Sequence, residues 1–99
     1  GWQPTDEAAL ERAGVAIGSG IGSLTDIVEA STVLSARGHR RVSPHFIPKM
    51  LVNMAAGQVS IRTGFKGPSA SPSTACATGV HALSDALHII QRGAADVML

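Results

Sequence analysis

A chain of 99 residues is long enough for one small domain, and a large share of its surface stays in contact with water. A net charge of +1, with 15% charged residues and no block of Lys and Arg interleaved with aromatic residues, argues against a nucleic-acid partner. One cysteine excludes an internal disulfide and indicates an intracellular protein. The lack of Cys/His zinc spacing argues against a metal site, and the lack of an apolar run of about 18 residues argues against a membrane span.

The first structural signal is a short apolar run closed by glycine, GVAIGS at residues 14–19, which predicts a buried strand. The glycines of GSGIGS, residues 18–23, suggest a phosphate-binding loop. However, the G-x-G-x-x-G spacing is incomplete and no Lys-Ser/Thr ending follows. We therefore interpret this segment as a tight turn between a strand and a helix, in which glycine permits close packing.

Two helices are predicted next by the spacing of apolar residues. The first covers residues 23–37, where Ser23 with Asp26 resembles a capping box and a glycine supplies the stop. The second covers residues 48–63 and opens with a proline. Gly57 within it costs about 1 kcal/mol relative to alanine, so we expect a close backbone neighbour there.

The last third of the chain predicts an extended segment, a helix and a strand. Residues 69–75 are small and extended, residues 77–92 form the most regular helix, and a strand begins at 96. The helix is amphipathic, with one apolar stripe made of Val80, Leu83, Leu87 and Ile90. Because strands and helices alternate along the chain, we expect an α/β fold with a parallel sheet.

Cys76 is the only cysteine, and it lies where the extended segment becomes the helix. A lone cysteine most often acts as a small hydrophobic residue, but three local features favour a nucleophile. A helix start favours a thiolate, and small neighbours permit a sharp turn like that of the serine nucleophile elbow. The backbone N–H at such a turn can also donate to an oxyanion. We therefore predict that Cys76 is catalytic.

A row of polar residues on the same helix offers a second candidate site, made of His81, Asp85, His88 and Arg92. Two histidines and one carboxylate leave a zinc site one ligand short, and the polar face of an amphipathic helix explains all four residues. We therefore expect no metal there. His81 is also poorly placed as a base for Cys76, because five positions along a helix turn the two side chains roughly 140° apart.

The segment STACATGVHAL, around Cys76, resembles the nucleophile segment of the β-ketoacyl-acyl-carrier-protein synthases, the condensing enzymes of fatty acid synthesis. The likeness continues through GVAIGSGIGSL, RVSPHFIPKMLVNMAAGQVSIR, GFKGP and GAADVML, in the order of the elongating synthase I/II branch. It implies part of a thiolase-like fold, with layered α-β-α architecture and a mixed, mainly parallel sheet. It also implies that residues 1–99 are a fragment of the N-terminal β-ketoacyl synthase domain.

The resemblance implies a decarboxylative condensation without a cofactor. In the family, a cysteine takes an acyl chain from acyl-carrier protein as a thioester, and the carbanion formed from malonyl-carrier protein attacks that thioester. Cys76 matches the nucleophile, and its N–H would supply half of the oxyanion hole. Ile21 aligns with a residue lining the acyl-chain pocket, and Phe46 with one reaching that pocket across the interface of a homodimer. For both residues, ordinary core packing is the alternative.

The chain also departs from the family. The family's two catalytic histidines and a lysine lie in downstream segments that are absent here, and the chain's own histidines, His39, His45, His81 and His88, do not replace them. We therefore expect the 99 residues alone to be inactive. Pro72 removes a backbone donor from a strand that pairs with its copy across the family's dimer, which weakens the expectation that this piece dimerises.

Three other functions stay open. A polyketide ketosynthase domain often reads Asp-Thr-Ala-Cys-Ser-Ser, which fits Ser73 and residues 77–79 less well. A non-catalytic truncated fragment is the second, and a cysteine hydrolase, which needs a histidine base, is the third. The segment LVNMAAGQVSIR is similar to the same segment in mitochondrial members of the family. We therefore expect the protein to be located in the mitochondrion, with the cytoplasm of bacterial members as the alternative.

Overall fold

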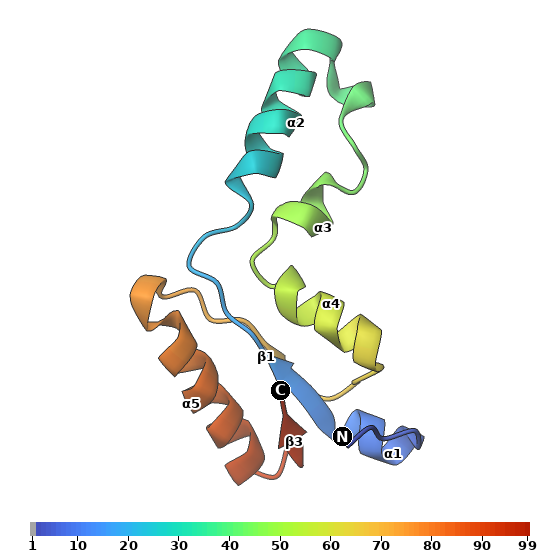
Figure 1. Cartoon of the computed structure of the whole chain (residues 1–99), viewed down its shortest axis with the longest axis vertical. Helices are drawn as coiled ribbons and strands as arrows, with labels where there is room; N and C mark the ends of the chain where they lie inside the picture. Colours follow the sequence, from blue (N-terminus) through green and yellow to red (C-terminus); the bar gives the residue numbers. More distant parts are fainter. Residues whose placement is uncertain (1) are drawn as a thin grey trace.

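The computed structural model describes residues 2–99 and has the predicted α/β alternation (Figure 1). In chain order the elements are α1 (Glu7–Glu11), β1 (Ala13–Ala16), α2 (Leu24–Arg37), the 3₁₀ turn η1 (His39–Arg41), α3 (Phe46–Met50), α4 (Met54–Thr63), β2 (Ser69–Ala70), the 3₁₀ turn η2 (Ala75–Ala77), α5 (Thr78–Gln91) and β3 (Val97–Met98). No helix of residues 2–99 combines the length and apolarity needed to cross a membrane.

A parallel sheet of three short strands, in the order β2-β1-β3, forms the centre of the fold. In β1, Val15 pairs with Ser69 of β2, and Gly14 pairs with Met98 of β3. Because β1 has a neighbour on each edge, it is the buried strand that the apolar run of the sequence predicts. The helices between the strands are the crossovers that parallel pairing requires.

Helices α4 and α5 lie on opposite sides of β1, which gives the layered α-β-α arrangement expected of the family (Figure 1). Ala13 and Val15 are buried in one cluster with Ala56 of α4 and with Phe65. These two strand residues are two positions apart and therefore point to the same face of the sheet. On α5 the buried residues are Thr78, Ala82 and Ile89.

The apolar stripe of α5 does not face this core. Val80, Leu83, Leu87 and Ile90 are 68%, 74%, 53% and 41% exposed. The helix instead buries Thr78, Ala82 and Ile89. The amphipathic pattern is therefore correct, but this stripe has no partner within residues 2–99.

The chain is also more extended than an ordinary domain of its size. Its radius of gyration is 16.4 Å, against about 13 Å for a compact domain of 100 residues. Helix α2 projects away from the sheet at one end of the molecule (Figure 1). It carries further exposed apolar side chains, including Leu24, Val28 and Leu34. Much apolar surface is therefore available for contacts beyond residues 2–99.

The predicted helix over 48–63 is wrong in one respect, because two helices replace it. Leu51 ends α3 with extended dihedrals (φ −69°, ψ 132°), and α4 begins at Met54. Pro48 lies within the first turn of α3, where its missing N–H would have no partner in the helix anyway. The expected backbone neighbour of Gly57 is also absent, since the atoms nearest to an added Cβ belong to the Met54 side chain.

The glycine turn after β1 packs as closely as predicted. A Cβ on Gly18 would lie 2.4 Å from the carbonyl oxygen of Pro72 and 2.4 Å from Cγ2 of Thr78. The next helix, α2, has the predicted cap, because the N–H of Asp26 donates to Oγ of Ser23. The space for a side chain at position 18 is thus taken by the segment that leads into α5.

Gly18→Ala should therefore destabilise the protein by about 1–3 kcal/mol, the usual cost of forcing a methyl group into packed structure. Urea unfolding of the protein would measure the loss. Gly79→Ala is the matched control, because a Cβ there meets nothing within 4 Å, and a helical alanine is favoured over glycine by about 1 kcal/mol. Equal midpoints for the two variants would contradict the close contact.

An ion pair joins the segment before β1 to the segment before β3. Nε and Nη2 of Arg12 donate to the two carboxylate oxygens of Asp96 at 2.7 and 2.6 Å, and Nη2 also donates to the carbonyl oxygen of Gly93 (3.1 Å). Hydrogen bonding and the positive charge of Arg12 hold the pKa of Asp96 below its ordinary value. Both side chains are largely exposed, so the effect on stability is small.

The sign of the pH effect follows from the lowered pKa of Asp96. The pair stabilises the fold fully above the unfolded carboxyl value of about 3.9, and this contribution is lost as the pH falls through the lower folded value. Asp96→Asn should therefore reduce the drop in urea midpoint between about pH 5 and pH 2. Glu11→Gln is the control, since Glu11 forms no ion pair among residues 2–99; an equal reduction there would contradict the assignment.

Candidate active site

Cys76 lies at the predicted place, in the short turn η2 directly before α5, and it is exposed. The preceding residue, Ala75, has φ +50°, the one positive φ of a non-glycine residue within residues 2–99. Such a conformation costs an L-residue about 1–2 kcal/mol and therefore needs support from its surroundings. The chain thus turns sharply at residues 75–76 and presents the thiol at the corner between an extended segment and a helix.

Hydrogen bonds from Thr74 supply much of that support. The backbone N–H of Thr74 donates to Oγ1 of Thr78 (2.8 Å), and its carbonyl oxygen accepts from the N–H of Ala77 (3.1 Å). Thr78 is buried, with 6% of its surface exposed, so its hydroxyl is a fixed acceptor. The corner that carries Cys76 is therefore closed by Ala77, the last residue of η2, and by Thr78, the first residue of α5.

The glycine turn supports the same corner from behind. An added Cβ on Gly20 would lie 3.3 Å from Cα of Ala75. The hydroxyl of Ser71 lies 2.8 Å from the carbonyl oxygen of Ile17, to which it donates, and 3.3 Å from that of Val52. These contacts fix the extended segment before Cys76 to the end of β1 and to the linker between α3 and α4.

His81 reaches the corner from the next turn of α5. Its Nδ1 lies 2.7 Å from Oγ1 of Thr74, within hydrogen-bond distance. Sequence reasoning missed this pair and the role of Thr78. The signal that could have identified them is the spacing of polar side chains around the cysteine, with Thr74 four residues before Thr78 and seven before His81.

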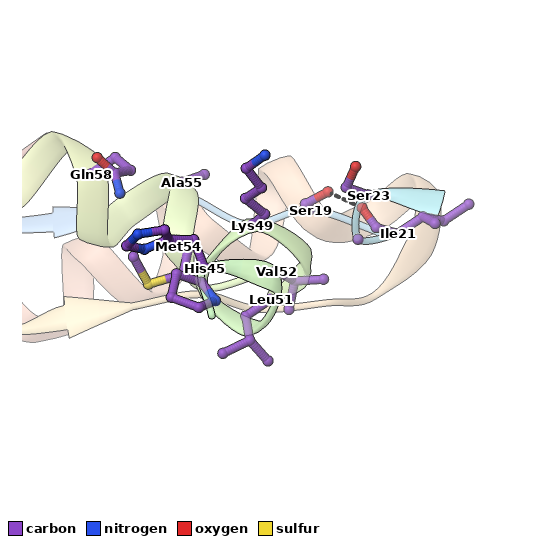
Figure 2. A pocket seen from close by; sticks show the side chains of 12 residues that line it. Ser19, Ile21, Ser23, His45, Lys49, Leu51, Val52, Met54, Ala55 and Gln58 are labelled. Carbon is purple, nitrogen blue, oxygen red and sulfur yellow. Dashed lines mark hydrogen bonds between the residues drawn. The ribbon is translucent and has the colours of Figure 1, made fainter. Parts of the chain in front are cut away.

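Ile21 and Phe46 line two separate hollows. Ile21 lies at one end of a groove of about 470 Å³ between the glycine turn and α3–α4, with its side chain pointing outward (Figure 2). Phe46 lines a smaller hollow of about 130 Å³ between α2 and α3. Cys76 lines neither hollow, so the structure does not bring the three predicted site residues into one pocket.

The groove at Ile21 has mixed chemistry. The Ser19 hydroxyl donates to the carbonyl oxygen of Ile21 (2.7 Å), which holds the glycine turn in place (Figure 2). The residues lining the groove include the apolar Leu51, Val52 and Met54 as well as Lys49. Among residues 2–99, no three His, Cys, Asp or Glu side chains gather closely enough to hold a metal ion.

Comparison with known proteins decides the family. A family model described as beta-ketoacyl synthase, N-terminal domain, matches residues 1–99. The chain belongs to the β-ketoacyl synthase family. The resemblance that the segment around Cys76 suggests therefore extends over the whole chain.

Curated relatives in this family are 3-oxoacyl-[acyl-carrier-protein] synthases. The mitochondrial enzyme of Arabidopsis thaliana is 56% identical over 98 residues, which are 99% of this chain and 21% of the relative. Synthase 2 of Rhizobium meliloti is 52% identical over 99 residues, all of this chain and 24% of the relative. The chain thus spans about a fifth to a quarter of the length of these synthases.

Solved ketosynthases share the fold. A type II polyketide ketosynthase, in complex with its acyl-carrier protein and bound to the hexaketide, matches 91% of this chain and 26% of its own, with a TM-score of 0.84 and 28% identity. A β-ketoacyl synthase from Burkholderia phymatum matches 93% of this chain and 23% of its own, with a TM-score of 0.76 and 31% identity. These matches confirm the thiolase-like fold class.

Thr78→Val tests the hydrogen bond that supports the corner carrying Cys76. The substitution removes the oxygen that accepts the Thr74 N–H and keeps the shape of the side chain. We expect a loss of about 1 kcal/mol in the free energy of unfolding, measured with urea. Thr78→Ser keeps the hydroxyl and should retain more of the stability. If the serine variant lost as much as the valine variant, the methyl group rather than the hydrogen bond would be responsible.

Proposed function

We propose that the protein containing this chain is a 3-oxoacyl-[acyl-carrier-protein] synthase of fatty acid synthesis, with Cys76 as its nucleophile. The observation that carries the proposal is the position of Cys76, exposed at a strained corner before α5, in a chain that matches the β-ketoacyl synthase N-terminal domain from end to end. The identity of 56% and 52% to synthases of this name supports the same activity.

The reaction has two halves. The Cys76 sulfur attacks the carbonyl carbon of an acyl thioester on acyl-carrier protein, so that a new C–S bond forms and the carrier thiol leaves with a proton. A malonyl thioester on a second carrier protein then loses CO₂. Its carbanion forms a C–C bond to the Cys76-bound acyl carbon, and the Cys76 thiolate leaves and takes up a proton.

This chain would contribute mainly to the first half. Cys76 lies at the corner before α5, and its N–H is the chain's candidate donor to the oxyanion. A thiolate is also a good leaving group from the acyl-enzyme. Loss of CO₂ would need catalytic groups from segments outside this chain, because none of its four histidines matches the family's two catalytic histidines.

We further propose that residues 1–99 form one part of a longer synthase and do not catalyse the condensation alone. Two observations support this view. The relatives are four to five times longer, and the apolar stripe of α5 lacks a partner within residues 2–99. In the complete protein, Ile21 and Phe46 would line the acyl-chain pocket once further segments, or the second subunit of a homodimer, connect their hollows with Cys76.

Acyl-carrier protein is the proposed partner, since it appears in the names of the relatives and in the complex of the polyketide ketosynthase.

Pro72 lies beyond the last residue of β2, so the described sheet does not use its missing N–H. Pairing between two copies in the proposed homodimer is a separate contact, and there the missing donor of Pro72 still weakens the expectation that this piece dimerises. The mitochondrion is the proposed compartment because the Arabidopsis relative carries that location in its name, with the cytoplasm as the alternative suggested by the bacterial relatives.

A polyketide ketosynthase is the second candidate, and the match to such an enzyme at a TM-score of 0.84 favours it. Its identity of 28% is half that of the Arabidopsis fatty acid enzyme. Fatty acid synthesis therefore fits better. The two functions differ in the carrier protein that delivers the acyl group, which makes the choice measurable.

Cys76→Ala should lower the rate of condensation by about 10³-fold or more, because the variant lacks the atom that holds the acyl chain. The complete protein would be incubated with acyl-carrier protein of fatty acid synthesis, and the peptide containing Cys76 would be examined by mass spectrometry for the added acyl group. His88→Gln is the control, since His88 is an exposed residue at the far end of α5. Unchanged condensation in Cys76→Ala would refute the proposal, and acylation only by a polyketide carrier protein would favour the second candidate.

A further inference from the structure

Thr74 connects the extended segment to α5 through every polar group that it has. Its N–H donates to Thr78, its carbonyl oxygen accepts from Ala77, and its hydroxyl lies 2.7 Å from Nδ1 of His81. Cys76 lies inside the loop that these three bonds close. Any movement of Thr74 relative to α5 would therefore move the cysteine as well.

The bond to His81 differs from the other two. The bonds to Thr78 and Ala77 involve the backbone of Thr74, and they form with the first residue of α5 and with the residue directly before it. The bond to His81 joins two side chains and reaches one turn further along the helix. It therefore restrains the rotation of the Thr74 side chain and ties the residue before the strained Ala75 to the second turn of α5.

The contacts of His81 argue against a role as general base for Cys76. Its Nδ1 is already engaged with Thr74, and no hydrogen bond joins it to Cys76 within residues 2–99. It is therefore not arranged as a base for the thiol. The next polar residues on the helix face, Asp85 and His88, make no hydrogen bond to His81 within residues 2–99, so this histidine is not part of a polar chain along α5.

We propose that His81 is a positioning residue for Cys76, which holds the thiol in the orientation needed for attack on the acyl thioester by anchoring Thr74. This inference rests on the proposed function, because it concerns the same cysteine. Nδ1 of His81 either accepts the Thr74 hydroxyl proton or donates its own proton to the hydroxyl oxygen, and both arrangements give the same anchor. The reaction rate depends steeply on the position of the attacking atom, since a misplacement of about 1 Å can lower the rate about 100-fold.

The test uses two pairs of substitutions in the complete protein. The side-chain amide of asparagine occupies the place of histidine Nδ1, whereas that of glutamine reaches the place of Nε2, so His81→Asn keeps the anchor and His81→Gln removes it. Thr74→Ser likewise keeps the hydroxyl, and Thr74→Val removes it. The readout is the single-turnover rate at which acyl-carrier protein acylates Cys76, divided by the amount of Cys76 that iodoacetamide can label.

We expect His81→Gln and Thr74→Val each to slow acylation by about 10- to 100-fold, with no change in the concentration of acyl-carrier protein at half-saturation. His81→Asn and Thr74→Ser should remain close to the wild-type rate. The double variant H81Q/T74V should be no slower than either single variant, because both remove the same bond.

The outcomes separate the two proposals. If wild-type protein forms no acyl thioester at Cys76, the proposed function fails and the positioning role fails with it. If wild-type protein is acylated and His81→Gln matches His81→Asn, only the positioning role is overturned. It is also overturned if the effects of His81→Gln and Thr74→Val multiply in the double variant, or if the slower rate is fully explained by a smaller amount of labelled thiol.

Discussion

Parallel pairing of β1 with β2 is the constraint on which the candidate site depends. Two adjacent parallel strands end at the same edge of the sheet, and here the glycine turn follows β1 while the segment leading to Cys76 follows β2. The two segments, more than 50 residues apart in the chain, therefore lie against each other. Gly18 and Gly20 make this contact possible, because each lies where a Cβ would touch the segment from Pro72 to Thr78.

Sequence alone could predict the parts of the fold that depend on local chemistry. Alternating apolar and helical patterns give the order of strands and helices, and the caps at Ser23 and Gly38 fix the ends of α2. The position of Cys76 follows from the change of pattern at residue 76. Helix α1 was not identified because its five residues contain no long apolar pattern, although Asp6 caps it by accepting from the N–H of Ala9 (3.0 Å).

Features that depend on tertiary contact could not be predicted in the same way. The break at Leu51 has no glycine or proline to mark it, and it leaves Val52 beside the Ser71 hydroxyl. The face of α5 that is buried carries Thr78, Ala82 and Ile89, whereas the pattern of larger apolar residues points to another face, which is exposed within residues 2–99. The spacing of Thr74 and His81 marks them as a candidate pair, but the hydrogen bond itself depends on the turn at Ala75, which the sequence does not specify.

The three bonds of Thr74 differ in sequence separation from the rest of the site. They join residues three, four and seven positions apart, whereas Ser71 contacts a residue 54 positions away. Contacts of low sequence separation close small loops and can form within microseconds, while distant pairings wait for the slower search of the whole chain. The corner that presents the thiol can therefore assemble with its helix as a local unit, and the glycine turn docks onto a shape that already exists.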